Sequence, residues 1–209
     1  MAKHRRVLII HTGGTLGMQS PDRTRLDLGD DGHLQRLIER VPELAEIADI
    51  DLVAPWNLDS SDIGPDEWVR LAEMMVRQGG VGERSGDGSL KGYDGIVVIH
   101  GTDTMAYTAS AISYMMDNLD RPIVFTGSQR PLEAWRSDAR ANLAAAVELA
   151  TMDVPEVLIA FGDVILRGCR ASKIDANSYR AFAAPSSGTI GSIGTELSVR
   201  QVQVRQPGG

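Results

Sequence analysis

Five short, almost purely apolar runs are the feature that most constrains how this chain can fold. Such runs are typical of strands buried on both faces, as the strands of a parallel sheet are. The segments between them carry apolar residues at helical spacing, and this alternation predicts an α/β fold with a mostly parallel sheet. The predicted strands cover residues 7–10, 50–53, 95–99, 122–126 and 157–161, and the predicted helices cover 33–40, 66–77, 105–118 and 137–151.

Two of the predicted strands run directly into small and hydroxyl-bearing residues. The first is followed by Thr-Gly-Gly-Thr at 12–15 and the third by His-Gly-Thr-Asp at 100–103. Ligands of open α/β sheets bind just beyond the carboxyl ends of strands, so both segments are candidates for one cleft. Gly13 and Gly14 can adopt a positive φ and admit a substrate or another backbone, which would expose the hydroxyl of Thr15.

Two other interpretations of the first turn have to be weighed. An isolated Thr-Gly-Gly-Thr is more often a plain strand-to-loop turn than part of a site. A nucleotide-binding loop would need further glycines or a lysine. The chain has no Gly-x-Gly-x-x-Gly after this strand and no Gly-Lys-Ser/Thr, so the sequence does not support a phosphate cradle.

Composition argues against several further classes of function. The net charge of −7 does not suit electrostatic binding of nucleic acid, and the single cysteine, Cys169, cannot form an intrachain disulfide. One cysteine and four scattered histidines do not predict a structural zinc site. The first apolar run is too short for the core of a signal peptide. The sequence also contains no run of about 18 apolar residues, which is the length that a membrane-spanning helix needs. We therefore expect a cytoplasmic protein with no metal, no nucleic-acid partner and no membrane association.

Six segments together resemble the bacterial L-asparaginase family, and most of all its cytoplasmic type I branch. They occur in the order and spacing of the family, and the resemblance extends over roughly residues 5–190. It implies a three-layer, Rossmann-like or flavodoxin-like sheet flanked by helices, as in the asparaginase amino-terminal domain. It also implies hydrolysis of L-asparagine to L-aspartate and ammonia by a threonine nucleophile, without cofactor. The matching segments are 12–15, 58–62, 100–109, 126–131, 137–143 and 167–173.

The resemblance gives candidate catalytic roles to four residues. Thr15, rather than Thr12, matches the first nucleophile, while Thr102 and Lys173 match the second threonine and its lysine partner. Asp103 matches the acid that joins this relay and pairs with the α-ammonium group of the substrate. These residue types suit the chemistry, because a threonine hydroxyl is a weak nucleophile until a neighbouring group accepts its proton. Taken alone, a lysine such as Lys173 is more often a solvated surface group.

The segment Asp-Ser-Ser-Asp at 59–62 has two interpretations. By resemblance it is the loop that holds the substrate α-carboxylate, with hydroxyls and backbone amides as donors. As a bare motif it more often caps a helix, and both can hold if Ser61 or Asp62 caps the helix that contains Trp68. The implied substrate-binding residues are Asp59, Ser60, Ser61, Thr102 and Asp103.

The chain departs from the family in two places. The family's mobile loop after the glycine turn carries a tyrosine that assists the first threonine. Here residues 18–32 contain no aromatic residue, and Arg25 stands at about that position. The family also has a smaller second domain, which completes the site across a subunit interface, and this chain of 209 residues ends where that domain would begin. We expect one domain over 1–190, a linker over 191–209 toward an absent carboxy-terminal domain, and a homo-oligomer, either dimer or tetramer.

Two alternatives to an asparaginase stay open. One is the glutamine-hydrolysing subunit of a tRNA-dependent amidotransferase, which shares these motifs but normally carries an extra amino-terminal domain. The other is a catalytically silent module that binds an amino acid or mediates dimerisation, which the missing lid tyrosine and second domain favour. The glycine-rich and charged segment 78–91 is predicted to be a flexible surface insertion without assigned function.

Overall fold

The computed structural model describes residues 4–17, 39–86 and 91–200. Its centre is an eight-stranded sheet in the order β10-β9-β6-β5-β4-β3-β1-β2, and β7 and β8 form a separate two-stranded sheet. The strands are β1 (Arg6–His11), β2 (Asp49–Val53), β3 (Gly95–Ile99), β4 (Ile123–Thr126), β5 (Val157–Phe161), β6 (Val164–Arg167), β7 (Ser172–Lys173), β8 (Phe182–Ala183), β9 (Gly191–Ile193) and β10 (Leu197–Val199).

The first five strands are parallel, as the apolar runs predict. They lie in the order β2-β1-β3-β4-β5, which is the flavodoxin-like arrangement. Every residue of β3, β4 and β5 is buried, whereas β2, at the edge, is only partly covered. The chain order reverses between β1 and β3, and such a switch point is where α/β sheets of this kind bind their ligands.

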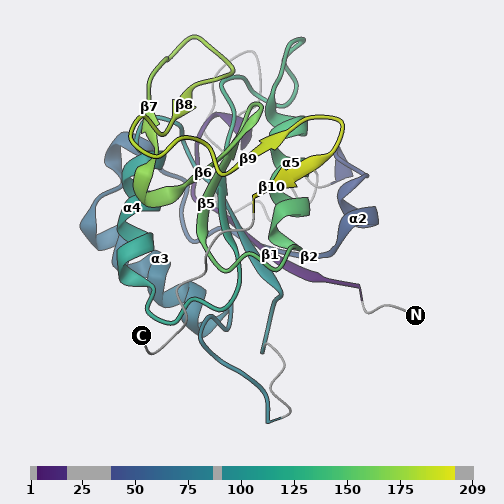
Figure 1. Cartoon of the computed structure of the whole chain (residues 1–209), viewed down its shortest axis with the longest axis vertical. Helices are drawn as coiled ribbons and strands as arrows, with labels where there is room; N and C mark the ends of the chain where they lie inside the picture. The colour runs from purple at the N-terminus through teal and green to yellow at the C-terminus, as the bar shows by residue number, and fades with distance from the viewer. Residues whose placement is uncertain (1–3, 18–38, 87–90, 201–209) are drawn as a thin grey trace.

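Helices cover both faces of the sheet and complete a three-layer fold (Figure 1). On one face α3 (Pro65–Arg77) and α4 (Met105–Met115) pack on alternate strand residues such as Leu8 and Val98. On the other face the short α2 (Leu44–Ile47) and α5 (Ala139–Ala150) cover the intervening residues, such as Ile9 and Val97. The expected three-layer, mostly parallel architecture is therefore confirmed. Of the helix predicted at 33–40, residues 33–38 lie outside the described part of the chain.

The sheet continues beyond the predicted strands through antiparallel pairs. The strand β6 returns beside β5, β9 pairs with β6, and β10 pairs with β9. Residues 191–199, in the segment expected to be a linker, thus supply two strands of the sheet. The domain boundary at 190 and the role of 191–209 stay predictions.

The helix that contains Trp68 is not capped as predicted. It begins at Pro65 with Gly64 as its N-cap, and the Glu67 carboxylate accepts a hydrogen bond of 3.0 Å from the Gly64 N–H. Ser61 and Asp62 belong instead to a separate short 3₁₀ helix, η2 (Ser60–Asp62). Proline fits the first turn of a helix because an N–H at that position would have no partner within the helix. This preference explains why α3 begins at Pro65, three residues after Asp62.

The segment predicted to be a flexible insertion is tied to the core where the structure describes it. The Arg121 side chain is fully buried, and its guanidinium donates to main-chain carbonyls of Gly79 (3.0 Å) and Lys91 (2.8 Å). It also reaches the carbonyls of Glu83 and Tyr93. The main chain is therefore anchored at Gly79, Glu83, Lys91 and Tyr93, and residues 87–90 lie outside the described part of the chain. None of the helices in the described ranges has the length and apolarity needed to cross a membrane.

Candidate active site

Three loops meet at the switch point because glycines let their backbones touch. Gly14 has a φ of +91°, and a Cβ added there would lie 2.6 Å from the Cα of Gly101. A Cβ on Gly101 would in turn lie 2.6 Å from the Cβ of Ser60. Real side chains do not fit at either position, so the glycine turn after β1, the end of β3 and the start of η2 are in direct contact. The close backbone approach predicted for Gly14 is confirmed.

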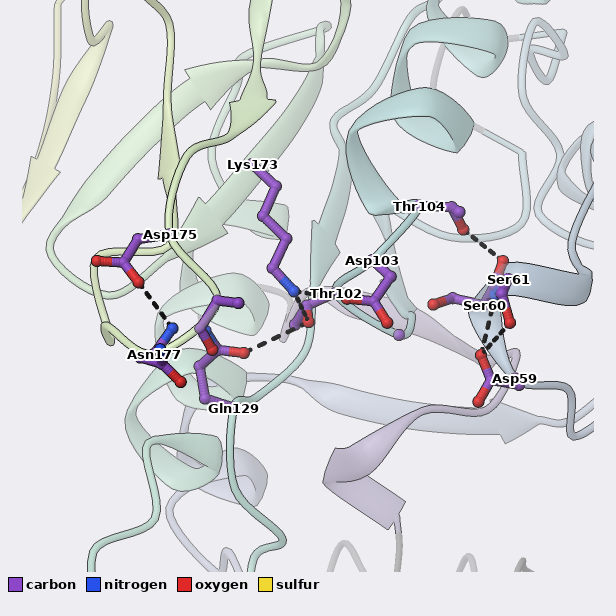
Figure 2. Close-up of polar contacts among 12 residues, drawn as sticks. Asp59, Ser60, Ser61, Thr102, Asp103, Thr104, Gln129, Lys173, Asp175 and Asn177 are labelled. Atoms are coloured by element: carbon purple, nitrogen blue, oxygen red, sulfur yellow. Dashed lines mark hydrogen bonds and ion pairs between the residues drawn. The ribbon is translucent and has the colours of Figure 1, made fainter.

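Lys173, Thr102 and Asp103 form one hydrogen-bonded cluster at this edge. The Lys173 Nζ donates to the Thr102 Oγ1 over 2.8 Å and to the Asp103 Oδ1 over 2.7 Å (Figure 2). The lysine side chain is 17% exposed and the aspartate side chain 71% exposed. Lys173 is thus not a solvated surface group: β7 holds its amine between a hydroxyl and a carboxylate that faces solvent.

A cavity of about 580 Å³ adjoins this cluster. It is lined on one side by Ala106, Tyr107 and Ser110 of α4 and on the other by the segment 171–176, with Asp103 and Lys173 in its wall. An open volume of this size is ample for an amino acid, so the cluster is accessible to a small ligand.

Thr12 and Thr15 stand in different surroundings. Thr12 is fully buried, and its hydroxyl donates to the Ile99 carbonyl over 3.0 Å. Thr15 is only partly buried and begins the 3₁₀ helix η1 (Thr15–Gly17), directly after the glycine that packs on Gly101. The hydroxyl of Thr12 is committed to the fold, which supports Thr15 as the candidate nucleophile of the two.

The 59–61 loop lies against the residues that follow β3, with Ser60 next to Gly101. The Asp59 carboxylate accepts hydrogen bonds from the Ser61 N–H (3.0 Å) and hydroxyl (2.7 Å), so it shapes the loop rather than offering donors. Ser60 is buried beside Gly101, and its carbonyl accepts from the Thr104 hydroxyl over 2.6 Å. Of the three residues, Ser60 lies nearest the Thr-Asp pair and is the candidate donor to an anion.

Two further residues next to the cluster carried no prediction. The Gln129 amide lies beside Thr102 and also bonds the segment that follows Lys173, as described below. His100 is fully buried, and its Nδ1 donates to the Gly101 carbonyl over 2.8 Å. Burial lowers the pKa of His100 from its ordinary 6.5 to about 4, so the ring is neutral at neutral pH. Gln129 lies in the matching segment 126–131 and His100 begins the segment 100–103, but the residue type alone predicted no role for either.

The lid segment 18–32, with Arg25, lies outside the described residues. Among the residues that are described, no group of three or more His, Cys, Asp or Glu side chains is arranged to hold a metal ion.

Comparisons with known proteins show which family this chain is similar to. The family described as Asparaginase, N-terminal matches residues 6–205. L-asparaginase 1 of Escherichia coli is 39% identical over 184 residues, which are 86% of this chain and 51% of that protein. The structure of L-asparaginase I from Vibrio cholerae superposes with a TM-score of 0.81 at 33% identity, covering 99% of this chain and 60% of the other. A probable cytoplasmic L-asparaginase from Campylobacter jejuni gives a TM-score of 0.75 at 30% identity, covering 93% and 56%.

The chain spans about half the length of the curated relative it matches. The family match, by contrast, covers nearly all of the chain, including both strand-end motifs and the lysine segment. The relatives named asparaginase 1 and cytoplasmic asparaginase agree with the type I resemblance. The chain belongs to the asparaginase family, whose amino-terminal domain it matches.

Proposed function

We propose that this protein hydrolyses L-asparagine to L-aspartate and ammonia. The observation that carries the proposal is the Lys173 amine, held 2.8 Å from the Thr102 hydroxyl and 2.7 Å from the Asp103 carboxylate at the switch point of the sheet. Hydrolysis of a carboxamide needs a nucleophile, a group that accepts its proton and an acid for the departing ammonia. This cluster, with Thr15 across the contact between the glycines, offers each of these groups.

In the proposed reaction the Thr15 hydroxyl attacks the side-chain amide carbon of asparagine. Ammonia leaves with a proton from the site, and water then hydrolyses the acyl-threonine ester to release aspartate. Thr102 and Lys173 form the proposed proton relay: the neutral Lys173 amine accepts the proton of the attacking Thr15 hydroxyl through the Thr102 hydroxyl, and the ammonium group that results gives a proton back to the departing ammonia. Asp103 stabilises the ammonium ion that results, since its carboxylate is already hydrogen-bonded to the amine.

Recognition of the substrate follows from charge and exposure. The Asp103 carboxylate is largely exposed and is the proposed partner of the α-ammonium group. Ser60, with the loop that Asp59 shapes, is the proposed partner of the α-carboxylate, and Ser61 belongs to the same loop. The two charged groups of an amino acid would be held apart in this way, leaving its side chain to reach the threonines.

We further propose that the protein acts in the cytoplasm as a homo-oligomer. The resemblance to type I enzymes supports both statements, and one of the matching structures is described as a probable cytoplasmic asparaginase. A neighbouring subunit would close the cavity beside Asp103, exclude water and add orienting contacts. On this proposal an isolated copy of the chain binds asparagine but turns it over more slowly than the assembled homo-oligomer.

The test combines calorimetry with an ammonia assay. Succinamic acid lacks the α-amine, so it should bind more weakly than asparagine by roughly 1.5 to 3 kcal/mol if Asp103 holds the ammonium group. Equal affinities would remove Asp103 from that role. Ammonia release from asparagine supports the enzyme, and asparagine binding without ammonia release by the assembled protein would identify a silent binding module instead. Glutamine as a parallel substrate reports the preference between the two amides.

A further inference from the structure

The Gln129 side chain connects the candidate relay to the segment that follows its lysine. Its Nε2 donates to the main-chain carbonyls of Ser178 (3.0 Å) and Ala176 (3.2 Å). Its Oε1 lies 3.4 Å from the Thr102 Oγ1 (Figure 2). Because the two carbonyls can only accept hydrogen bonds, the NH₂ end must face them, and the orientation of the amide is therefore fixed with its oxygen toward the hydroxyl.

The loop that carries Gln129 is itself held firmly. The buried Asp138 carboxylate accepts hydrogen bonds from the main-chain N–H of Gln129 (3.0 Å) and of Arg130 (3.1 Å). Asn142 donates to the same carboxylate over 3.1 Å and to the Gly127 carbonyl over 2.9 Å. A carboxylate that receives several N–H bonds away from water fixes the backbone it binds, so the amide of Gln129 is presented on a rigid support.

The position of the amide decides where the Thr102 proton points. The Lys173 ammonium group has only donors, so the Thr102 oxygen accepts from it and the hydroxyl hydrogen must point elsewhere. Gln129 Oε1 is an acceptor within reach of that hydrogen. When the Lys173 amine loses a proton, the Thr102 hydroxyl can rotate so that its hydrogen bond passes from Gln129 Oε1 to the Lys173 Nζ.

We infer that Gln129 is a positioning residue for the proposed amide hydrolysis: it orients the Thr102 hydroxyl and clamps the 174–181 segment beside Lys173. The inference rests on the proposed function for its catalytic part. The clamp itself rests only on the two bonds to the carbonyls of Ala176 and Ser178, and it can be measured without turnover.

Two nearly isosteric variants separate the two ends of the amide. Gln129→Met removes the donors and the acceptor, and should lower kcat for ammonia release from asparagine by about tenfold or more, because small displacements at a reacting centre are costly. Its KM should stay within about threefold of the parent value, since Gln129 is not among the residues that line the cavity beside Asp103. Arg130→Met is the matched control: it alters the next residue in the loop, whose side chain is exposed, and should leave kcat unchanged.

Gln129→Glu gives a readout that a merely structural role would not move. It keeps an acceptor toward Thr102 but places a negative charge near the Lys173 amine, which should then keep its proton to higher pH. The ionisable groups already around that amine are Asp103, at 2.7 Å, and Asp175 and Tyr107 in the cavity wall. We expect the pH profile of ammonia release to move upward by about one pH unit in this variant and not in Gln129→Met.

Hydrogen exchange tests the clamp independently of activity. Both variants lose the donors to the carbonyls of Ala176 and Ser178, so amides in 174–181 should exchange about tenfold faster, while those of β3 and β4 are unchanged. Unchanged exchange in both variants overturns the clamp, and parent-like kcat in Gln129→Met overturns the positioning role. If the parent protein releases no ammonia, the proposed function fails, and faster exchange in 174–181 would still establish the clamp.

Discussion

Acidification should destabilise this protein through His100, the buried histidine directly before Gly101. In the folded chain the imidazole Nδ1 donates to the Gly101 carbonyl, and Nε2 has no hydrogen-bond partner among the described residues. A second proton would sit on that buried nitrogen with nothing to accept its hydrogen bond. For this reason burial holds the pKa at about 4 in the fold, against the ordinary 6.5 that applies in the unfolded chain.

The sign and size of the effect follow from these two values. Above pH 6.5 both states are neutral at this residue, and its contribution to stability is fully present. As the pH falls from 6.5 toward 4, the unfolded chain binds a proton that the folded chain does not, so the free energy of unfolding decreases. At roughly 1.4 kcal/mol for each pH unit, the loss accumulates to about 3 kcal/mol at pH 4, below which both states are protonated.

Urea unfolding followed by tryptophan fluorescence, from about pH 8 to about pH 4, measures this loss. His100→Asn keeps a donor near the Nδ1 position and removes the titrating ring; its packing cost is the same at every pH, so only the difference in slope is read. The parent should lose about 3 kcal/mol more than this variant over the range. His4→Asn, at an exposed histidine, is the control and should follow the parent. Parallel curves for the parent and His100→Asn would refute the assignment.

Other predictions concern the nucleophile and the buried arginine. Thr15→Ala should lower ammonia release by at least ~10³-fold without loss of folding. Thr12→Ala should lower the free energy of unfolding by about 1–2 kcal/mol and should reduce the rate of ammonia release less than Thr15→Ala does. The reverse pattern in activity and urea assays would exchange the roles of the two residues. Arg121→Met should destabilise the chain by about 3–5 kcal/mol, because several buried acceptors lose their donor. Arg180→Met removes an exposed ion pair and should cost at most about 1 kcal/mol in the same measurement.

The parallel part of the fold was predictable because its signal is local. A strand buried on both faces must be apolar throughout, and 95–99 and 157–161 reveal it without reference to the rest of the chain. The site was predictable at the level of strand ends for the same reason. Parallel strands bring their carboxyl ends to one edge, so the glycine turn at 12–15 and the Thr-Asp pair at 102–103 had to meet if both strands were paired.

What could not be predicted depends on partners far away in the sequence. Arg121 is typical of a surface residue until the carbonyls of Gly79 and Lys91 converge on it, about 30 to 40 residues upstream. Gln129 likewise gains its place from Thr102 and Ser178. The strands β9 and β10 are only three residues long, Gly-Ser-Ile and Leu-Ser-Val, so no apolar periodicity marks them. Pairing stabilises them instead: β9 pairs with β6, and β10 pairs with β9.

The decisive experiment compares ammonia release by the Lys173→Met and Lys91→Met variants of this protein. Both changes keep the apolar stem and remove an amine that pairs with a carboxylate. The Lys91 side chain, however, is 64% exposed and pairs with Glu83 on the surface rather than with a residue of the candidate relay. Loss of the amine beside Thr102 and Asp103 should lower turnover of asparagine by about 10²-fold or more, while asparagine binding suffers less. Lys91→Met should keep the parent rate. Parent-like ammonia release by Lys173→Met between about pH 6 and about pH 9 would contradict the account and make Lys173 an ordinary structural lysine.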